Sequence, residues 1–146
     1  MASVHDVAAY ILSRQGLMTA MKLHKLAYYS QAWTLAWDER PLFPERIEAW
    51  ANGPAVPELY HVHRGSFEVS EWPRGDASAL TDDEREAIDA VLDDYGDWSP
   101  QSLSDLTHTE DPWLRAREGL AALDRGNHEI THRSMEEYYS SLLEED

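Results

Sequence analysis

The segment KLHKLAYYSQAWTLAWDERPLFPERIEAWANGPAVPELY, residues 22–60, decides the fold. Its first half predicts a helix that begins after Thr19, a favoured N-cap residue, and continues to about Trp37. One apolar stripe of this helix starts at Leu23, and a second stripe on roughly the opposite side starts at Met21. Because a helix that is apolar on two sides is usually buried on both, we expect it to be the centre around which the rest packs.

The second half of the segment predicts a short strand followed by a turn. Apolar and polar residues alternate over residues 47–51, and Asn52-Gly53-Pro54 breaks this pattern. A short helix is expected from about Pro57 to Arg64. A second alternating stretch, residues 67–72, is expected to pair with residues 47–51 as a small ribbon. Such a ribbon is marginal alone, so it must lie on the helices.

Start and stop signals predict helices on both sides of this segment. They are a first helix over Val4–Ser13 and later helices beginning after Thr81, after Ser99, at Asp111-Pro112 and at Thr131 or Ser134. The final residues 144–146 are expected to fray. No internal repeat or low-complexity linker interrupts the chain, so residues 1–146 are expected to form one domain. The predicted fold class is mainly α: a compact bundle of about seven helices around a central hydrophobic helix, with at most a small two-stranded β ribbon.

Charge divides the chain into two unequal parts. The 146 residues include 28 acidic and 12 basic side chains, which give a formal net charge of -16. Acidic and basic residues balance over residues 1–64, so the whole excess lies in residues 65–146. A charge of this size repels nucleic acid and suits a partner with a basic surface. A simpler interpretation, a solvated acidic face, accounts for the same pattern.

Composition also indicates the compartment. The chain has no cysteine, which excludes disulfides and thiolate metal sites and favours a reducing cytoplasm. The N-terminus lacks the basic and apolar regions of a signal peptide, and no segment approaches the roughly 20 apolar residues of a membrane span. We therefore expect a cytoplasmic protein without membrane contact, and no cofactor.

One group of polar residues resembles a sparse metal site. Glu58 and His61 share one face of the predicted short helix, but His63 points elsewhere. A zinc site needs three or four converging ligands, so His24 or His108 would have to complete the set. Histidines with structural roles are the favoured interpretation, and no metal is expected.

A second group could act as a general acid and base. His108 lies two residues before Glu110, close to a helix end. A histidine held by a buried polar contact at a helix junction explains the pattern better. The sequence has no nucleophile elbow, dinucleotide-binding motif or Walker motif. The chain is therefore predicted not to be an enzyme, with catalysis by His108 or His61 as the weaker alternative.

Aromatic and basic residues suggest a recognition surface instead. Lys22 and Lys25 lie close to two tyrosines, but two lysines are too few to bind nucleic acid in so acidic a chain. Of the six tryptophans, Trp50 and Trp72 are the best candidates to be partly exposed, because both lie on the predicted ribbon. The predicted partner contacts are Lys25, Tyr29, Trp50, Pro54 and Trp72.

Several blocks of sequence, in this order, resemble one known family. They are KLHKLAYYSQAW (22–33), Pro41-Leu42-Phe43, IEAWANGPAVPELY (47–60), Tyr95-Gly96, LTHTEDPW (106–113), and a closing Ile130 with Met135 and Tyr138-Tyr139. The chain resembles the Panacea domain, the SocA-like antitoxin domain first described as phage-associated. Each block alone is a weak signal, but their shared order covers nearly the whole chain.

The resemblance implies an antitoxin of a bacterial or phage toxin–antitoxin system, with a role in phage defence. Such domains are compact and mostly helical, and they neutralise a cognate protein toxin by direct binding. One member of the family instead acts as an adaptor that delivers its toxin to a ClpXP-type protease, which is the alternative here. The family supplies no catalytic residue. The toxin's identity, the binding surface and the oligomeric state stay open at this point.

Overall fold

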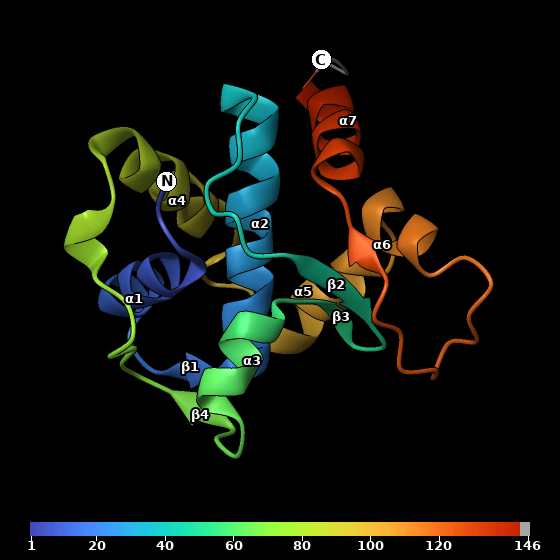
Figure 1. The fold of residues 1–146 in the computed structure, drawn as a ribbon, viewed down its shortest axis with the longest axis horizontal. Coiled ribbons are helices and arrows are strands. Elements are labelled where there is room, and N and C mark those ends of the chain that lie inside the picture. Colours follow the sequence, from blue (N-terminus) through green and yellow to red (C-terminus); the bar gives the residue numbers. More distant parts are fainter. Residues whose placement is uncertain (144–146) are drawn as a thin grey trace.

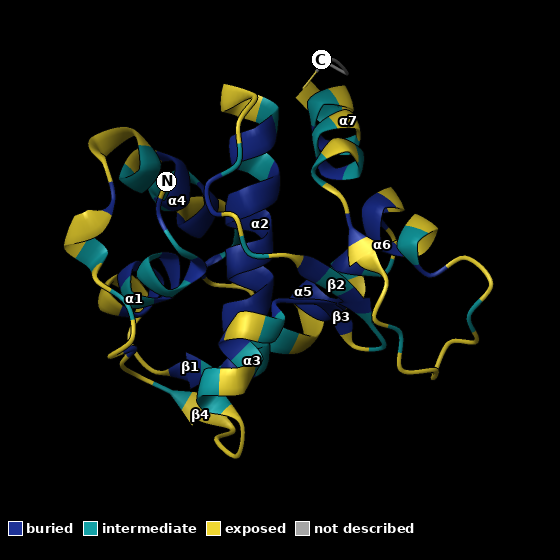
Figure 2. Cartoon of the chain, in the orientation of Figure 1, coloured by how far each residue is buried: buried dark blue, intermediate teal, exposed yellow. Residues whose placement is uncertain are grey.

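Helix α2, Ala20–Asp38, is the centre of the molecule, as the two apolar stripes predict (Figure 1). The computed structural model describes residues 1–143. The Thr19 hydroxyl accepts a hydrogen bond from the Lys22 amide at 3.1 Å and so caps the helix. Thirteen of its nineteen residues are buried, and its exposed residues lie in the C-terminal turn (Figure 2). The expectation of a central buried helix is therefore confirmed.

The other helices pack around α2. Their bounds are Val4–Gln15 for α1, Pro57–His63 for α3, Asp82–Tyr95 for α4, Pro100–Thr107 for α5, Asp111–Ala116 for α6 and His132–Leu143 for α7, with a short 3-10 helix η1 at Ala77–Ala79. In Figure 1, α1 and α4 lie on one side of α2, and α5, α6 and α7 lie on the other. All the predicted helices are present, and α1 continues two residues beyond its predicted end. The expected fraying of residues 144–146 lies outside the described residues.

The strands pair differently from the sequence expectation. Strand β2, Ile47–Trp50, pairs antiparallel with β3, Gly53–Ala55, on one edge and with β5, Glu129–Ile130, on the other. A separate two-stranded sheet joins β1, Met18–Thr19, to β4, Glu68–Val69. The predicted pairing of residues 47–51 with residues 67–72 is wrong, and the described β structure exceeds a single two-stranded ribbon.

A local chain reversal explains why β2 pairs with β3 and not with residues 67–72. Gly53 has a φ of +121°, which glycine adopts readily, and it lets the chain fold straight back onto β2 with Trp50 opposite Gly53. Closing so short a loop loses little entropy, so the adjacent hairpin outcompetes a pairing with residues 67–72. The mainly helical fold class itself is confirmed, because seven α-helices and only short strands occupy residues 1–143.

The hydrophobic core is continuous through the described residues and extends from α1 to α7. Trp72 and Trp113 are buried in it, whereas Trp50 is only half-buried. Partial exposure is thus confirmed for Trp50 and wrong for Trp72. The largest exposed tryptophan surfaces belong to Trp37 and Trp98, at 39% and 38%. Among residues 1–143, no helix combines the length and the apolar character that crossing a membrane requires.

Candidate functional site

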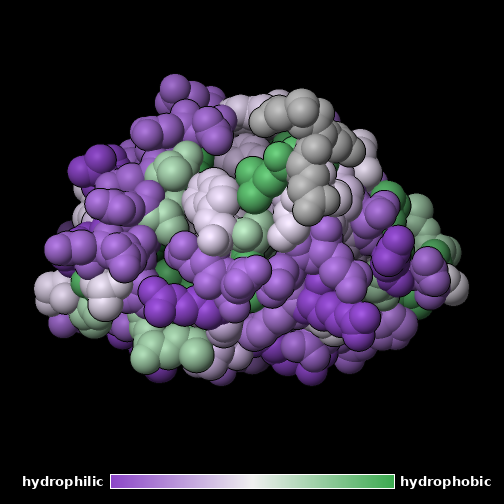
Figure 3. All heavy atoms as spheres, turned by 90° about the horizontal axis from the view of Figure 1, so that it is seen from above, coloured by the Kyte–Doolittle hydropathy of each residue, from purple (hydrophilic) through white to green (hydrophobic). Residues whose placement is uncertain are grey.

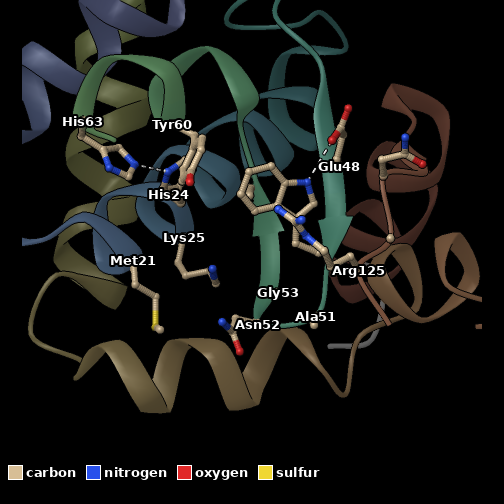
Figure 4. A pocket seen from close by; sticks show the side chains of 14 residues that line it. Met21, His24, Lys25, Glu48, Ala51, Asn52, Gly53, Tyr60, His63 and Arg125 are labelled. Atoms are coloured by element: carbon tan, nitrogen blue, oxygen red, sulfur yellow. Dashed lines mark hydrogen bonds between the residues drawn. The ribbon is translucent and has the colours of Figure 1, made fainter. Parts of the chain in front are cut away.

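A cavity of about 720 Å³ opens beside α2, and most of the residues around it come from the segment that decides the fold. One wall is the N-terminal part of α2, another is the β2–β3 hairpin, and the others are α3 and the loop over residues 125–127 (Figure 4). The lining residues that carry polar or aromatic side chains are His24, Lys25, Glu48, Trp50, Asn52, Tyr60, His63, Arg125 and Asn127.

Lys25 supplies a buried amine to this cavity. The side chain comes from α2, points toward the turn at Asn52 and Gly53, and is only 3% exposed (Figure 4). Its Nζ donates a hydrogen bond to the Pro54 carbonyl oxygen at 3.1 Å. Among residues 1–143 no carboxylate lies within ion-pair distance of it. Burial lowers the pKa of Lys25 to about 8, because removal from water penalises the charged form.

Gly53 leaves the room that the Lys25 side chain occupies. A Cβ atom on Gly53 would lie 2.6 Å from Lys25 Cε and 2.9 Å from Thr107 Oγ1. Both separations are closer than real contacts allow, so any other residue here would displace the side chains of Lys25 and Thr107. The turn glycine therefore serves the geometry of the cavity as well as the hairpin.

This arrangement gives a first prediction. Gly53→Ala should lower the free energy of unfolding by about 2 kcal/mol, from a strained positive φ together with the clash at Lys25. Gly65→Ala is the matched control, because Gly65 has a φ of +94° but no atom within 4 Å of the added methyl group. Urea unfolding monitored by circular dichroism measures both variants. Equal losses in the two variants would show that the contact with Lys25 has no effect on stability.

His24 and His63 form a hydrogen-bonded pair at the edge of the cavity. The Val56 amide donates to His24 Nδ1 at 3.0 Å, so that nitrogen carries no proton. Neutral His24 therefore donates from Nε2 to His63 Nε2, 2.8 Å away. Burial lowers the pKa of His24 well below its usual value, and Lys25 and His63 lower it further. Burial also lowers the pKa of His63, against opposing hydrogen bonds from backbone groups. Both imidazoles are therefore neutral near pH 7.

The residues considered for a metal site do not come together. Glu58 lies 3.5 Å from His5, and His61 is exposed on α3. Only His24 and His63 meet. Among residues 1–143 no group of three or more histidine, aspartate or glutamate side chains could hold a metal ion.

His108 and Glu110 likewise have separate partners. His108 stacks on the Trp113 ring with centroids 4.2 Å apart, and burial lowers the pKa of His108. Glu110 turns into the core, where it accepts hydrogen bonds from the hydroxyls of Tyr29 at 2.7 Å and Tyr139 at 2.8 Å. Burial raises the pKa of Glu110, while these two hydrogen bonds oppose the rise. The carboxylate thus joins three helices and does not face the imidazole.

The five predicted partner contacts occupy three places. Lys25 and Trp50 line the cavity, and the Pro54 carbonyl accepts the lysine's hydrogen bond. Tyr29 lies in the core against Glu110, and Trp72 is buried against α1, where its Nε1 donates to His5 Nδ1 at 3.1 Å. Trp50 is the only one of the five that is more than marginally accessible. Their role as partner contacts stays a prediction.

Hydrogen bonds to backbone carbonyls fasten the hairpin wall to α5 and α6. Ser104 donates to the Asn52 carbonyl at 2.6 Å, and Trp113 Nε1 donates to the Trp50 carbonyl at 2.8 Å. Arg117 donates to the Ala49 carbonyl at 2.8 Å. Two sequence blocks that are far apart in the chain, 47–60 and 106–113, are thereby joined in space.

Comparison with known families matches residues 23–114 to the SocA-like antitoxins with a Panacea domain. The chain belongs to this family. Comparisons with curated proteins and with solved structures give no significant match. The part that matches the Panacea domain contains Lys25, the hairpin and Trp113, whereas Arg125 and Tyr139 lie beyond it.

Several residues that line the cavity were not predicted from the sequence. Asn52, Tyr60 and Arg125 line it, yet only the first two lie in a recognisable motif. Arg125 follows α6 in an irregular loop, where no periodicity indicates what a side chain faces. Outside the cavity, the exposure of Trp37 and Trp98 was not predicted either, because no motif around them distinguishes an exposed tryptophan from a buried one.

Proposed function

We propose that this protein is the antitoxin of a toxin–antitoxin pair and neutralises a protein toxin by direct binding. The observation that carries the proposal is membership of the SocA-like antitoxin family over residues 23–114. His108 stacks on Trp113, whereas Glu110 accepts a hydrogen bond from Tyr29. Because these two side chains contact different residues, a binding function is favoured over acid–base catalysis.

Helix α4 offers the best surface for such a partner. Seven of its fourteen residues are acidic and one is basic. Asp83, Glu86, Asp93 and Asp94 are exposed and form no ion pair within residues 1–143. Seen from the end where α2 and α7 finish, hydrophilic side chains cover most of the surface, with small hydrophobic patches between them (Figure 3). This composition fits a basic partner surface.

An exposed tryptophan lies at one end of this acidic face. Trp37 and Asp38 of α2 line a shallow hollow of about 390 Å³ together with Asp83 and Glu86 of α4. A half-exposed tryptophan beside unpaired carboxylates can anchor an apolar side chain while the acids hold a lysine or arginine around it. We place the toxin's basic surface here, where the antitoxin would cover the toxin's substrate site.

Co-expression tests the proposal. Growth arrest caused by the product of an adjoining reading frame should be relieved by this protein, and the two proteins should co-purify. A stable stoichiometric complex supports neutralisation by occlusion. A toxin that disappears when this protein is present would indicate delivery to a ClpXP-type protease instead. An adjoining product that is harmless, or that shows no binding, would contradict the proposal.

Charge neutralisation on α4 tests the surface. The variant Asp83→Asn, Glu86→Gln, Asp93→Asn and Asp94→Asn should slow association with the toxin by about tenfold at low salt, because steering by exposed charge mainly raises the association rate. The control replaces Glu68, Glu71, Glu118 and Glu129 with glutamine, which removes the same charge from other exposed positions. Stopped-flow or surface-plasmon measurements give both rates. Equal slowing in both variants would assign the effect to net charge and not to α4.

A further inference from the structure

The Lys25 ammonium is a buried charge without a counter-charge. Buried cations in proteins are usually paired, because removal from water is costly without a compensating anion. The group has three N–H donors, and the Pro54 carbonyl is its one acceptor within residues 1–143. The side chain ends at the cavity surface, so its remaining donors can reach a molecule that enters (Figure 4).

The cavity is positive although the chain as a whole is strongly negative. Arg125 also lines it and forms no ion pair within the described residues. Glu48 is the one acidic residue of the lining, and it is already engaged by Arg46 at 3.0 Å and by Trp50 Nε1 at 2.9 Å. Two cations therefore face the cavity with no free carboxylate to balance them.

The walls of the cavity are aromatic. Trp50 and Tyr60 meet edge to face with ring centroids 5.4 Å apart, and Tyr60 contacts the His63 ring in the same manner at 5.5 Å. The volume of about 720 Å³ lies within the range of about 300–1,000 Å³ that is typical of small-molecule sites. A concave site of this size suits a compact ligand better than a polymer, and the net charge of -16 disfavours nucleic acid.

We propose that this cavity binds a small organic anion, whose carboxylate or phosphate group accepts hydrogen bonds from Lys25 and whose flat ring packs against Trp50 and Tyr60. Arg125 stands at the open side and contacts the same anionic group or a second one. The site goes beyond the proposed antitoxin function, because it requires no toxin and lies apart from the acidic face of α4.

Matched ligand pairs test the proposal and separate the two anion types. Purified protein is titrated by calorimetry, and by tryptophan fluorescence, with AMP against adenosine and with indole-3-acetate against indole-3-acetamide. At least one of the two anions should bind with a Kd below about 1 mM, and about tenfold more tightly than its neutral partner. Binding of AMP alone identifies a phosphate site, and binding of indole-3-acetate alone identifies a carboxylate site.

Variants locate the site. Lys25→Met should weaken binding of the anion by at least about tenfold, because it removes a charged hydrogen bond. Lys22→Met is the matched control on the same helix: Lys22 Nζ donates to the Gly96 carbonyl and does not line the cavity, so affinity should stay within about twofold. Arg125→Gln, at an exposed position, provides a second test that does not depend on how Lys25→Met folds, and it should also weaken binding.

The proposal is overturned by any one of three results. One is the absence of saturable binding by both anions at about 5 mM. Another is binding that neither Lys25→Met nor Arg125→Gln weakens. The third is binding of the neutral partners as tightly as the anions. If the Lys25→Met variant neutralises the toxin normally but no longer binds the anion, the two functions are separate. Both proposals then stand.

Discussion

Glu110→Ala should lower the free energy of unfolding by about 3–5 kcal/mol, the largest effect expected of a single substitution here. One oxygen of Glu110, Oε1, accepts from both Tyr29 and Tyr139. Because the Tyr139 hydroxyl donates to Glu110, Tyr28 must be the donor in its 3.1 Å contact with Tyr139. Removing the carboxylate leaves two buried hydroxyl donors without an acceptor and opens a void between α2, α6 and α7.

Glu110→Gln distinguishes the lost acceptor from the lost charge. A glutamine carbonyl oxygen has two lone pairs and can accept from both tyrosines, so this variant should lose less than about 1.5 kcal/mol. Urea unfolding at pH 7 compares the two variants. Equal destabilisation by glutamine and alanine would mean that the negative charge holds the tyrosines, and not the geometry of the acceptor.

The Lys25 amine should make stability depend on pH in the alkaline range. The difference between its ordinary pKa of 10.5 and about 8 in the folded protein corresponds to about 3 kcal/mol. Between these values the unfolded chain keeps the proton that the folded chain has released. The unfolded state then binds more protons, so the free energy of unfolding rises as the pH increases from about 8 toward 10.5. Below pH 8 both states are protonated and the full penalty is present.

Lys25→Met isolates this contribution. At pH 7 the variant should be more stable than the natural chain by about 2 kcal/mol, because the buried charge is gone while one hydrogen bond to Pro54 is lost. The advantage should shrink as the pH rises from 8 to 10. Above about pH 10 the buried tyrosines act in the opposite direction, since burial raises the pKa of Tyr95 to about 12 and those of Tyr28 and Tyr29 further.

Urea unfolding at intervals between pH 7 and 10 provides the measurement. The comparison is made between the natural chain and the variant at each pH, so that the tyrosines cancel. A constant difference across this range would show that Lys25 titrates normally and that its surroundings are wetter than the geometry indicates.

Features that depend on neighbours in sequence could be predicted here. Thr19, Thr81 and Ser99 begin helices at their own positions because a cap needs only the next three residues. The burial of α2 follows in the same way, since its two apolar stripes are visible in one segment. These local signals were enough for the fold class and for the central helix.

Features that depend on distant residues could not be predicted. Ile130 pairs with Ile47 on one edge of β2, and it stands in a two-residue strand with almost no pattern of its own. The sequence suggested Glu110 only as a possible acid–base partner of His108, yet its side chain turns inward because two tyrosine hydroxyls lie within reach. The cavity was missed for the same reason: Arg125 and the neutral histidine pair acquire their positions only when four separate segments come together.

The pairing of β2 with β5 has a consequence for synthesis of the protein. Ile47 leaves the ribosome long before its partner Ile130, and Tyr29 long before Tyr139, which shares Glu110 with it. Until then one edge of β2 carries unpaired backbone groups, and such edges readily pair with other chains. A nascent chain would therefore be vulnerable to aggregation and proteolysis until β5 and α7 have emerged, and truncation at residue 114, the end of the family match, should leave that vulnerability permanent.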